Sequence, residues 1–354
     1  MPSQVNCLRS AAMKIRAKAA SHRENFRDFS RAVAQVVKSW LAFLPASLNP
    51  LASPSHPASL PVVIPGLKRS ESAGFSLVAS CFSDRGDRGG LFRVGSDGIE
   101  QLDDIHTTGL SANENEFVRL LRCKNEAEDC TVRIYAIGAS IRNHRLSGLQ
   151  DGHDVLRLGD GYAAISASTN AIVWFDGSGT VTRRIVFPGD RDAWHVNSLL
   201  FIEGKLLASA FGRFIHHRQW DSDARIGEGI VFEVETGADV LTGLTCPHHP
   251  RKSGRTWVVC NSGERELVEI DTATGVFVRR LPLSGWTRGL AVTDALFFVG
   301  ITPPRHSTGA VMPARIAIVS REEWVEVDSI DLPVSEIYDL LFVRSSLLGL
   351  LTLS

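Results

Sequence analysis

Short apolar runs alternate with clusters of Gly, Asp, Ser and Asn from about residue 74 to the end of the chain. Runs of this kind, bounded by turn-forming residues, are typical of β-strands. Four kinds of strand-like segment recur in a fixed order. Segments of the first kind follow a polar cluster, and they start at residues 106, 153, 195, 248, 287 and 337. Because one propeller blade takes about 40 to 50 residues, the pattern predicts an all-β, six-bladed β-propeller.

The other three kinds of segment support the same repeat. Segments of the second kind place small residues after a β-branched or aromatic run, as in residues 76–82 and 206–212, which suits a crowded inner strand. The repeat region begins with a second-kind strand and ends with the first-kind strand at residue 337. We therefore expect the N- and C-terminal strands to close one blade together, which leaves no open sheet edge. The tail from residue 345 is unassigned.

The first 65 residues have a different character. Residues 9–43 are rich in Ala, Arg and Lys, contain no Gly or Pro, and place apolar side chains at helical spacing, at Phe26, Phe29, Val33, Val36, Val37, Trp40 and Leu41. A Pro- and Ser-rich stretch follows. The sequence predicts an amphipathic helical arm with a linker over residues 1–65 and the propeller over residues 66–354.

Three roles are open for this N-terminal arm. It can be a solvated helix, an element that docks to a partner or a membrane surface, or an organellar transit peptide, since no acidic residue precedes Glu24. A signal peptide or a membrane span needs a longer uninterrupted apolar run than residues 40–45 supply. We therefore expect neither export nor a transmembrane segment.

Composition narrows the partners and the compartment. The 354 residues are 44% hydrophobic, and 38 basic residues balance 39 acidic ones. No basic stripe is interleaved with aromatic residues, so nucleic-acid binding is not expected. The 6 cysteines include no CxxC pair. We interpret them as reduced thiols and expect a cytoplasmic protein, or an organellar one if the arm is a transit peptide.

Propeller geometry is expected to gather polar residues at one place. In an antiparallel blade the start of the first strand and the end of the second lie on the same face, around the central channel. The first-strand starts supply His106, His153, Asp154, His195, Asn197, His248, His249, Arg251, Arg288, Glu336 and Asp339. The second-strand ends supply Arg213, Asn261, Ser262, Glu264 and Arg305. Such a ring suits a polar ligand or a metal.

Each of these side chains also has a structural interpretation. A His or Asp at the start of a blade often caps a turn or bonds to the next blade. Trp194 and Trp286 can be wedges between blades or stacking platforms for a ligand. His216 and His217 lie in a long insertion within one blade, where a surface or lid role is expected.

Several motifs resemble a known group of sequences. They are WHVN (194–197), PHHPR (247–251), NSGE (261–264), GWTRGLA (285–291) and EIYD (336–339). Together they are similar to a group of bacterial propeller-like proteins that is defined only as a conserved domain of unknown function. The resemblance covers about residues 150–345, and it implies a propeller fold with shared polar positions but no reaction. Members of the group usually have a small residue at the position of His249, so His248 is the stronger candidate for a site residue.

One hypothesis is an enzyme with one divalent metal on the axis, a hydrolase or lyase that acts on a small anionic substrate. Imidazole and carboxylate ligands suit zinc, manganese or iron, and a metal with an open position activates water or polarises a carbonyl group. The predicted metal ligands are His153, His195, His248 and Glu336. The predicted catalytic residues are His195, His248, Glu264 and Glu336.

The remaining polar residues are predicted to hold the ligand. They are Trp194, Asn197, Arg251, Asn261, Arg288, Arg305 and Asp339, and their guanidinium groups suit an anionic group. The alternative hypothesis is a non-catalytic propeller that binds a small ligand or a protein. Ligands of one metal must lie about 2.0 to 2.2 Å from a common point, so histidines spread around the rim would favour this alternative.

Overall fold

The computed structural model describes residues 65–72, 74–82, 89–123, 125–222, 225–303 and 312–352. They belong to the second of two units, Met1–Leu60 and Pro61–Ser354, into which the chain divides. The predicted helical arm and its linker lie outside the described residues, apart from residue 65.

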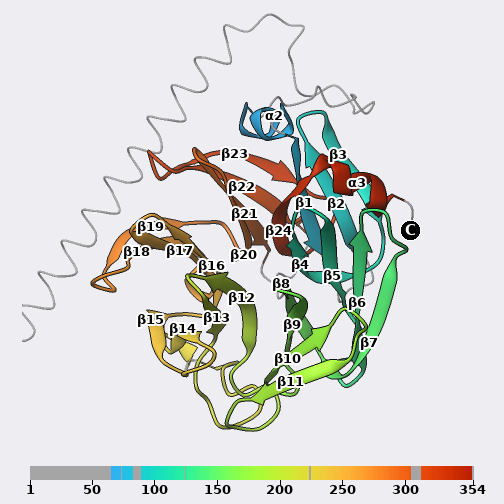
Figure 1. Cartoon of the computed structure of the whole chain (residues 1–354). Coiled ribbons are helices and arrows are strands. Elements are labelled where there is room, and N and C mark those ends of the chain that lie inside the picture. Colours follow the sequence, from blue (N-terminus) through green and yellow to red (C-terminus); the bar gives the residue numbers. More distant parts are fainter. Residues whose placement is uncertain are drawn as a thin grey trace, which may run out of the picture. The chain divides into compact units, whose positions relative to one another are not determined.

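The described residues form six four-stranded antiparallel sheets, which surround a central axis as blades (Figure 1). From the innermost strand outward, the first blade contains β24 (Ile337–Arg344), β1 (Phe75–Cys81), β2 (Gly90–Gly95) and β3 (Gly98–Asp103). The second contains β4 (Thr107–Ala112), β5 (Glu116–Leu121), β6 (Asp129–Ala136) and β7 (Arg142–Gln150). The third contains β8 (Gly152–Leu158), β9 (Gly161–Ser166), β10 (Ala171–Asp176) and β11 (Val181–Val186).

The other three blades follow the same order. The fourth contains β12 (Val196–Ile202), β13 (Lys205–Ala210), β14 (Gly229–Glu233) and β15 (Asp239–Leu244). The fifth contains β16 (Pro247–Ser253), β17 (Thr256–Asn261), the short 3-10 helix η3 (Ser262–Glu264), β18 (Glu266–Asp271) and β19 (Phe277–Pro282). The sixth contains β20 (Trp286–Val292), β21 (Leu296–Thr302), β22 (Arg315–Ser320) and β23 (Glu326–Asp331). The predicted all-β, six-bladed propeller is confirmed, and each predicted blade start lies within one residue of an inner strand.

The first blade joins distant parts of the chain. β24 pairs antiparallel with β1, from Phe75 opposite Arg344 to Cys81 opposite Ile337. Its innermost strand therefore comes from the C-terminal end of the chain, and its other three strands come from residues 75–103.

Apolar side chains fill the spaces between neighbouring blades. Between the third and fourth blades, Trp194 stacks on Phe187 with ring centroids 5.0 Å apart, and both rings contact Phe232. Burying an apolar side chain of this size contributes about 1.5–3 kcal/mol. The outer strands β3 and β11 are largely exposed, so the core lies in the inner and middle strands.

The inner strands share an irregularity near their starts. In every blade the register between the inner strand and its neighbour shifts there, as at a β-bulge. Residues at this level contact one another across the inner strands, and we call them the axial ring: Gly109, Asp154, Ser198, His249, Gly289 and Asp339.

Hydrogen bonds connect the axial ring from blade to blade. The Asp154 carboxylate accepts from the backbone N–H of Leu199 at 2.7 Å. Nδ1 of His249 accepts from the backbone N–H of Gly289 at 3.1 Å. Its Nε2 therefore carries the proton, and Nε2 lies 3.1 Å from a carboxylate oxygen of Asp339. The first two contacts join neighbouring inner strands, and the His249–Asp339 contact connects the fifth blade with the first.

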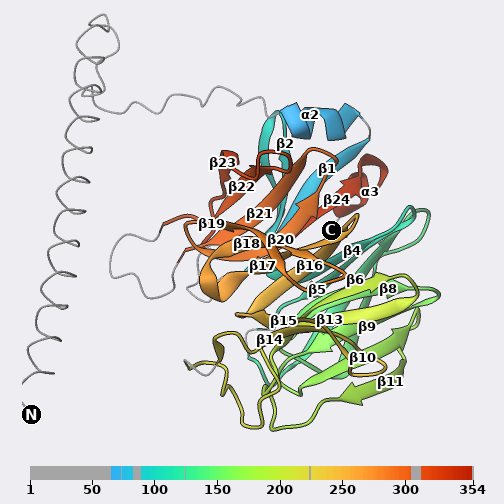
Figure 2. The same ribbon diagram turned by 90° about the vertical axis from the view of Figure 1, so that its left-hand side faces the viewer.

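Two α-helices of the described residues lie outside the sheets, both at the first blade (Figure 2). Helix α2 (Pro65–Ser72) buries Leu67 against this blade. Helix α3 (Ser345–Leu351), formed by the unassigned tail, buries Leu347 and Leu351 against the first and second blades. Within the described ranges, no helix is long and apolar enough to cross a membrane.

Candidate functional site

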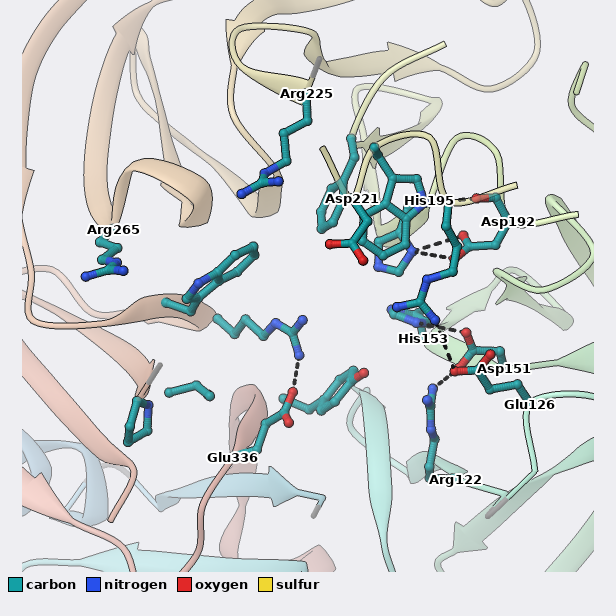
Figure 3. Close-up of a pocket in the computed structure, with 18 residues that line it drawn as sticks. Arg122, Glu126, Asp151, His153, Asp192, His195, Asp221, Arg225, Arg265 and Glu336 are labelled. Carbon is teal, nitrogen blue, oxygen red and sulfur yellow. Dashed lines mark hydrogen bonds and ion pairs between the residues drawn. The ribbon is translucent and has the colours of Figure 1, made fainter. Parts of the chain in front are cut away.

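A cavity of about 570 Å³ lies at the end of the channel where the inner strands begin (Figure 3). The starts of β8, β12, β20 and β24 line it, together with the ends of neighbouring strands and the long segment between β13 and β14. Small-molecule sites commonly enclose about 300–1,000 Å³. The cavity is therefore large enough for a metabolite.

The first of two histidine–carboxylate pairs lies just before β12. Residues 192–195 form a turn that ends at His195, which has a left-handed φ of 49°. This turn places Nδ1 of His195 2.9 and 3.1 Å from the two carboxylate oxygens of Asp192. The imidazole contacts the rings of Phe211 and Trp220, each with centroids 4.2 Å away. Because Asp192 holds Nδ1, Nε2 is the nitrogen left for a ligand.

The second pair lies at the start of β8, on the neighbouring blade. Nε2 of His153 lies 3.6 Å from one carboxylate oxygen of Asp151, and Arg122 forms an ion pair with the other oxygen. The rings of His153 and His195 meet edge to face with centroids 4.7 Å apart. The two histidines therefore share one wall of the cavity.

Burial sets the protonation states of these groups. It lowers the pKa of His195 to about 3 and the pKa of His153 to about 4, so both imidazoles are neutral at pH 7. Burial raises the pKa of Asp192 to about 7. Burial also raises the pKa of Asp151, but His153 and Arg122 outweigh it and hold that pKa well below its usual range. The Asp192–His195 pair therefore exchanges a proton near neutral pH while Asp151 stays ionised.

An arginine–glutamate ion pair lies across the cavity from Asp151 (Figure 3). Arg288 on β20 pairs with Glu336, which directly precedes β24. The guanidinium carbon of Arg288 lies 4.8 Å from the ring centroid of Tyr338. Both charged side chains are buried, so each offsets the charge of the other at the cavity wall.

The inserted segment between β13 and β14, of which the structure describes residues 211–222 and 225–228, forms another side of the cavity. The indole Nε1 of Trp220 donates to the backbone oxygen of Asp192 at 2.9 Å. Arg218 lies over the Trp220 ring and 3.7 Å from a carboxylate oxygen of Glu126. His216 in this segment is exposed and is not part of the cavity lining, in line with the expected surface role.

Four predicted metal, catalytic or ligand-binding residues line the cavity: His153, His195, Arg288 and Glu336. Trp286, one of the two tryptophans singled out from the sequence, lines it as well. The first four come from the third, fourth, sixth and first blades. The start of an inner strand therefore does direct polar side chains to the mouth of the channel.

Other predicted ligand-binding residues have structural partners instead. Trp194 is a wedge between the third and fourth blades. Asn197 donates to the backbone oxygen of His195 at 3.1 Å. Asn261 accepts from the backbone N–H of Thr245 at 2.6 Å. None of these three predicted residues is part of the cavity lining.

The remaining predicted residues also lie away from the cavity lining. Glu264 is exposed and accepts from the hydroxyl of Thr245 at 3.1 Å. Arg251 lies within β16, and Asp339 belongs to the axial ring. Arg305 lies outside the described residues.

His248 is buried behind Phe211, whose ring centroid is 5.3 Å away. Its Nδ1 lies 3.1 Å from the backbone oxygen of Cys246. Because a carbonyl oxygen only accepts, Nδ1 carries the proton and Nε2 is an acceptor. This Nε2 is buried and has no hydrogen-bond partner in the described ranges. His248 thus supports the wall of the cavity from below.

The structure shows what each of the predicted metal ligands His153, His195, His248 and Glu336 contacts. Among the residues described, no group of three or more His, Cys, Asp and Glu side chains is placed to hold a metal ion. His153 and His195 are each engaged by a carboxylate, and Arg288 engages Glu336. These contacts direct three of the four side chains to different partners, and the fourth, His248, is bonded through Nδ1 to the backbone oxygen of Cys246.

Sequence reasoning missed the carboxylates that hold the two histidines. Asp151 precedes His153 by two positions, and Asp192 precedes His195 by three. This short spacing between an aspartate and a histidine was the feature of the sequence that could have indicated each pair. No pattern signalled Arg225 or Arg265, which also line the cavity, because both lie between strands rather than at the start of an inner strand.

Comparisons with known proteins agree with the fold. A family model described as a domain of unknown function (DUF4915) matches residues 126–348. No curated protein sequence matches the chain. A chain in a crystal structure of a nidogen–laminin complex aligns over 77% of this chain and 99% of its own length, with 10% identity and a TM-score of 0.55. A protein of unknown function from Bacteroides caccae aligns over 76% and 99%, with 10% identity and a TM-score of 0.53. At such identities the likeness shows the fold alone.

Proposed function

The chain belongs to the family described as a domain of unknown function (DUF4915), and from its cavity we propose a hydrolase or lyase that acts on a small anionic substrate by acid–base catalysis. One observation carries the proposal. Two neutral histidines, each held by a carboxylate, lie with ring centroids 4.7 Å apart in a cavity of about 570 Å³. A positioned imidazole is the commonest general acid or base in enzymes.

His195 is the proposed general base. Its Nε2 accepts a proton, while Asp192 holds Nδ1 and stabilises the imidazolium that forms, as the carboxylate does in a catalytic triad. In hydrolysis the proton leaves a water whose oxygen bonds to a carbonyl carbon, and the imidazolium then gives it to the leaving oxygen as the C–O bond breaks. In elimination His195 instead takes the proton from the carbon next to a carboxylate; a C=C bond forms as the C–O bond on the adjacent carbon breaks, and the imidazolium gives the proton to the departing hydroxyl, which leaves as water.

His153 is the proposed orienting group. Because Asp151 stays ionised, Nε2 of His153 carries the proton that faces this carboxylate, and Nδ1 is an acceptor. An acceptor beside His195 can bond one hydrogen of the attacking water or of a substrate hydroxyl. That bond leaves the other hydrogen for Nε2 of His195.

Participation of a divalent metal has weaker support than proton transfer. The predicted ligand Glu336 is engaged by Arg288, and His153 and His195 are engaged by their own carboxylates. We therefore assign the chemistry to the histidine–carboxylate pairs and include added metal in the test.

The test is a proton NMR screen with the full-length chain. Esters and lactones of small hydroxy acids, and the hydroxy acids themselves in heavy water, are incubated with and without zinc or manganese. We expect turnover of at least one compound without added metal, at a rate that falls about 10²–10⁴-fold in His195→Gln. His144→Gln, on outer strand β7, is the matched control and should keep the wild-type rate.

Two outcomes would overturn acid–base catalysis by these pairs. Turnover that requires added metal would favour the metal-dependent hypothesis. Equal rates in wild type and His195→Gln would remove His195 from the reaction. If compounds bind equally to both proteins and none reacts, the non-catalytic alternative is favoured.

A further inference from the structure

The arginines of the cavity lining differ in whether a carboxylate already neutralises them. Of the five lining arginines in the described ranges, three are neutralised, in the pairs Arg122–Asp151, Arg218–Glu126 and Arg288–Glu336. Arg225 and Arg265 are the other two, and neither forms an ion pair with another described residue. Two cationic groups therefore remain available to a ligand.

Arg225 comes from the inserted segment, and Figure 3 shows its guanidinium directed into the cavity. One terminal nitrogen donates to the backbone oxygen of Ser222 at 3.0 Å. The Nε atom is buried and has no hydrogen-bond partner among the described residues. The Arg225 side chain also interacts with the Cys246 thiol, so the terminal guanidinium nitrogens are the donors left for a ligand in the cavity.

Arg265 directly follows η3 and has a left-handed φ of 55°. Its backbone N–H bonds to the oxygen of Ser262 at 3.0 Å, and its backbone oxygen accepts from Leu283 at 2.7 Å. These bonds hold the residue at the rim while its guanidinium stays without a carboxylate. Figure 3 places Arg265 across the cavity from Asp192 and Asp151.

The charged residues of the lining favour an anion near Arg225 and Arg265. Four of the five lining carboxylates are engaged by an arginine or by His195. Asp221 is the fifth, and it forms no ion pair within the part of the chain that the structure describes. The two arginines thus share one carboxylate that has no other ion-pair partner among the described residues. Because His195 is neutral at pH 7, the lining as a whole carries one net positive charge when Asp192 is protonated and none when Asp192 is ionised.

We propose that Arg225 and Arg265 bind a terminal oxyanion of the substrate, a phosphate or a carboxylate, while its reacting end lies at His195 and His153. The assignment rests on the proposed function. The planar guanidinium fork can donate two parallel hydrogen bonds to such a group. The substrate is then a small two-ended molecule, with the oxyanion at one end and the bond to be broken at the other.

This assignment differs from the anion site expected from the sequence, which consisted of Arg251, Arg288 and Arg305. Glu336 neutralises Arg288, and Arg251 lies along β16 outside the cavity lining. The two arginines that replace them come from the inserted segment and from the turn before β18. The residues that select the substrate therefore lie in the connections between strands, whereas the residues that transfer the proton lie at the starts of inner strands.

The test is calorimetric titration of the full-length chain with three matched three-carbon probes: glycerol 3-phosphate, glycerate and glycerol. We expect at least one anionic probe to bind and glycerol to give no signal. Arg225→Met and Arg265→Met should each weaken that binding about tenfold or more, since each removes a charge-assisted hydrogen bond. Arg225→Lys, which keeps the charge, should bind with intermediate affinity. Arg145→Met, on exposed β7, is the matched control and should bind as wild type does.

The outcomes separate the two proposals. Tighter binding of glycerol 3-phosphate than of glycerate identifies a phosphate, and the reverse identifies a carboxylate. Absence of binding by both anions, or equal affinity in wild type, Arg225→Met and Arg265→Met, would overturn the anion site and leave acid–base catalysis untouched. Anion binding that weakens in Arg225→Met and Arg265→Met while no compound is turned over would leave the anion site standing without acid–base catalysis.

Discussion

Nδ1 of His195 lies 2.9 Å from the carboxylate of Asp192, which precedes it by three positions. The turn between them is closed from outside by Trp220, whose indole donates to the backbone oxygen of Asp192 at 2.9 Å. The pair is therefore held by two elements, the start of β12 and the inserted segment. Both partners are buried. The charge of this wall of the cavity therefore depends on whether Asp192 is protonated.

Asp192→Asn should remove a titration near neutral pH. Burial raises the pKa of Asp192 to about 7, so loss of its proton should shift the ring ¹⁵N signals of His195 around that pH. A carboxamide has no such proton. The measurement is ¹⁵N NMR of histidine-labelled chain from about pH 5 to about pH 9. A step near pH 7 that persists in Asp192→Asn would contradict the assignment.

His153 should make the fold less stable in acid. Burial lowers its pKa to about 4, whereas an unfolded histidine has a pKa of about 6.5. Between these values the unfolded state binds more protons, so the free energy of unfolding falls as pH drops from about 6.5 to about 4. The full shift corresponds to about 3 kcal/mol. Urea denaturation of His153→Gln should show a flatter pH dependence over this range.

His144→Gln is the matched control for this pH effect. His144 lies on outer strand β7 and not in the cavity lining, so its replacement should leave the slope of stability against pH unchanged. An equal slope in wild type and His153→Gln would show that burial of His153 does not govern the acid sensitivity of the fold.

Most of the fold could be predicted because blade starts recur as polar clusters before apolar runs. His153, His195, Arg288 and Glu336 were found in the cavity for the same reason, since each lies at such a start. Which polar groups are satisfied by the protein itself could not be predicted. Asn261, for example, is bonded to the backbone of Thr245, and that contact depends on how the connection before β16 packs against the end of β17.

The inserted segment shows a second limit of the sequence. It has no repeat and no periodic pattern, so its length could be predicted but not the direction of Trp220 or Arg225. Trp220 contacts His195, which lies 25 positions from it in the chain, and the guanidinium of Arg225 is directed into the cavity (Figure 3). Tertiary packing, rather than local propensity, decides both.

Asp339→Asn should destabilise the fold without weakening anion binding. One carboxylate oxygen of Asp339 accepts from the backbone N–H of Leu110, and the other accepts from Leu340 and lies 3.1 Å from Nε2 of His249. An amide nitrogen at either position would face a donor. We expect a loss of about 2–3 kcal/mol, measured by urea denaturation, and unchanged calorimetric affinity for glycerol 3-phosphate. Normal stability with weakened binding would instead support the ligand role predicted for Asp339 from the sequence.

Gly289→Ala and Gly254→Ala form a matched pair that tests how closely the inner strands meet. Both glycines have left-handed φ values, 69° and 61°, so both substitutions carry a conformational cost of about 1–2 kcal/mol. An added Cβ at Gly289 would lie 2.9 Å from the backbone of Asp339 and Leu340, whereas at Gly254 it would meet nothing within 4 Å.

The steric contact should add about 1–3 kcal/mol to the cost of Gly289→Ala alone, because Gly289 lies in the axial ring and backbone atoms of β24 cannot move away without displacing the next blade. The measurement is the free energy of unfolding of both variants in urea. Equal losses would mean that the inner strands separate easily at the axis. The ring would then not be what holds His195 and His153 at their spacing, and the geometry of the cavity would have to depend on the packing between blades.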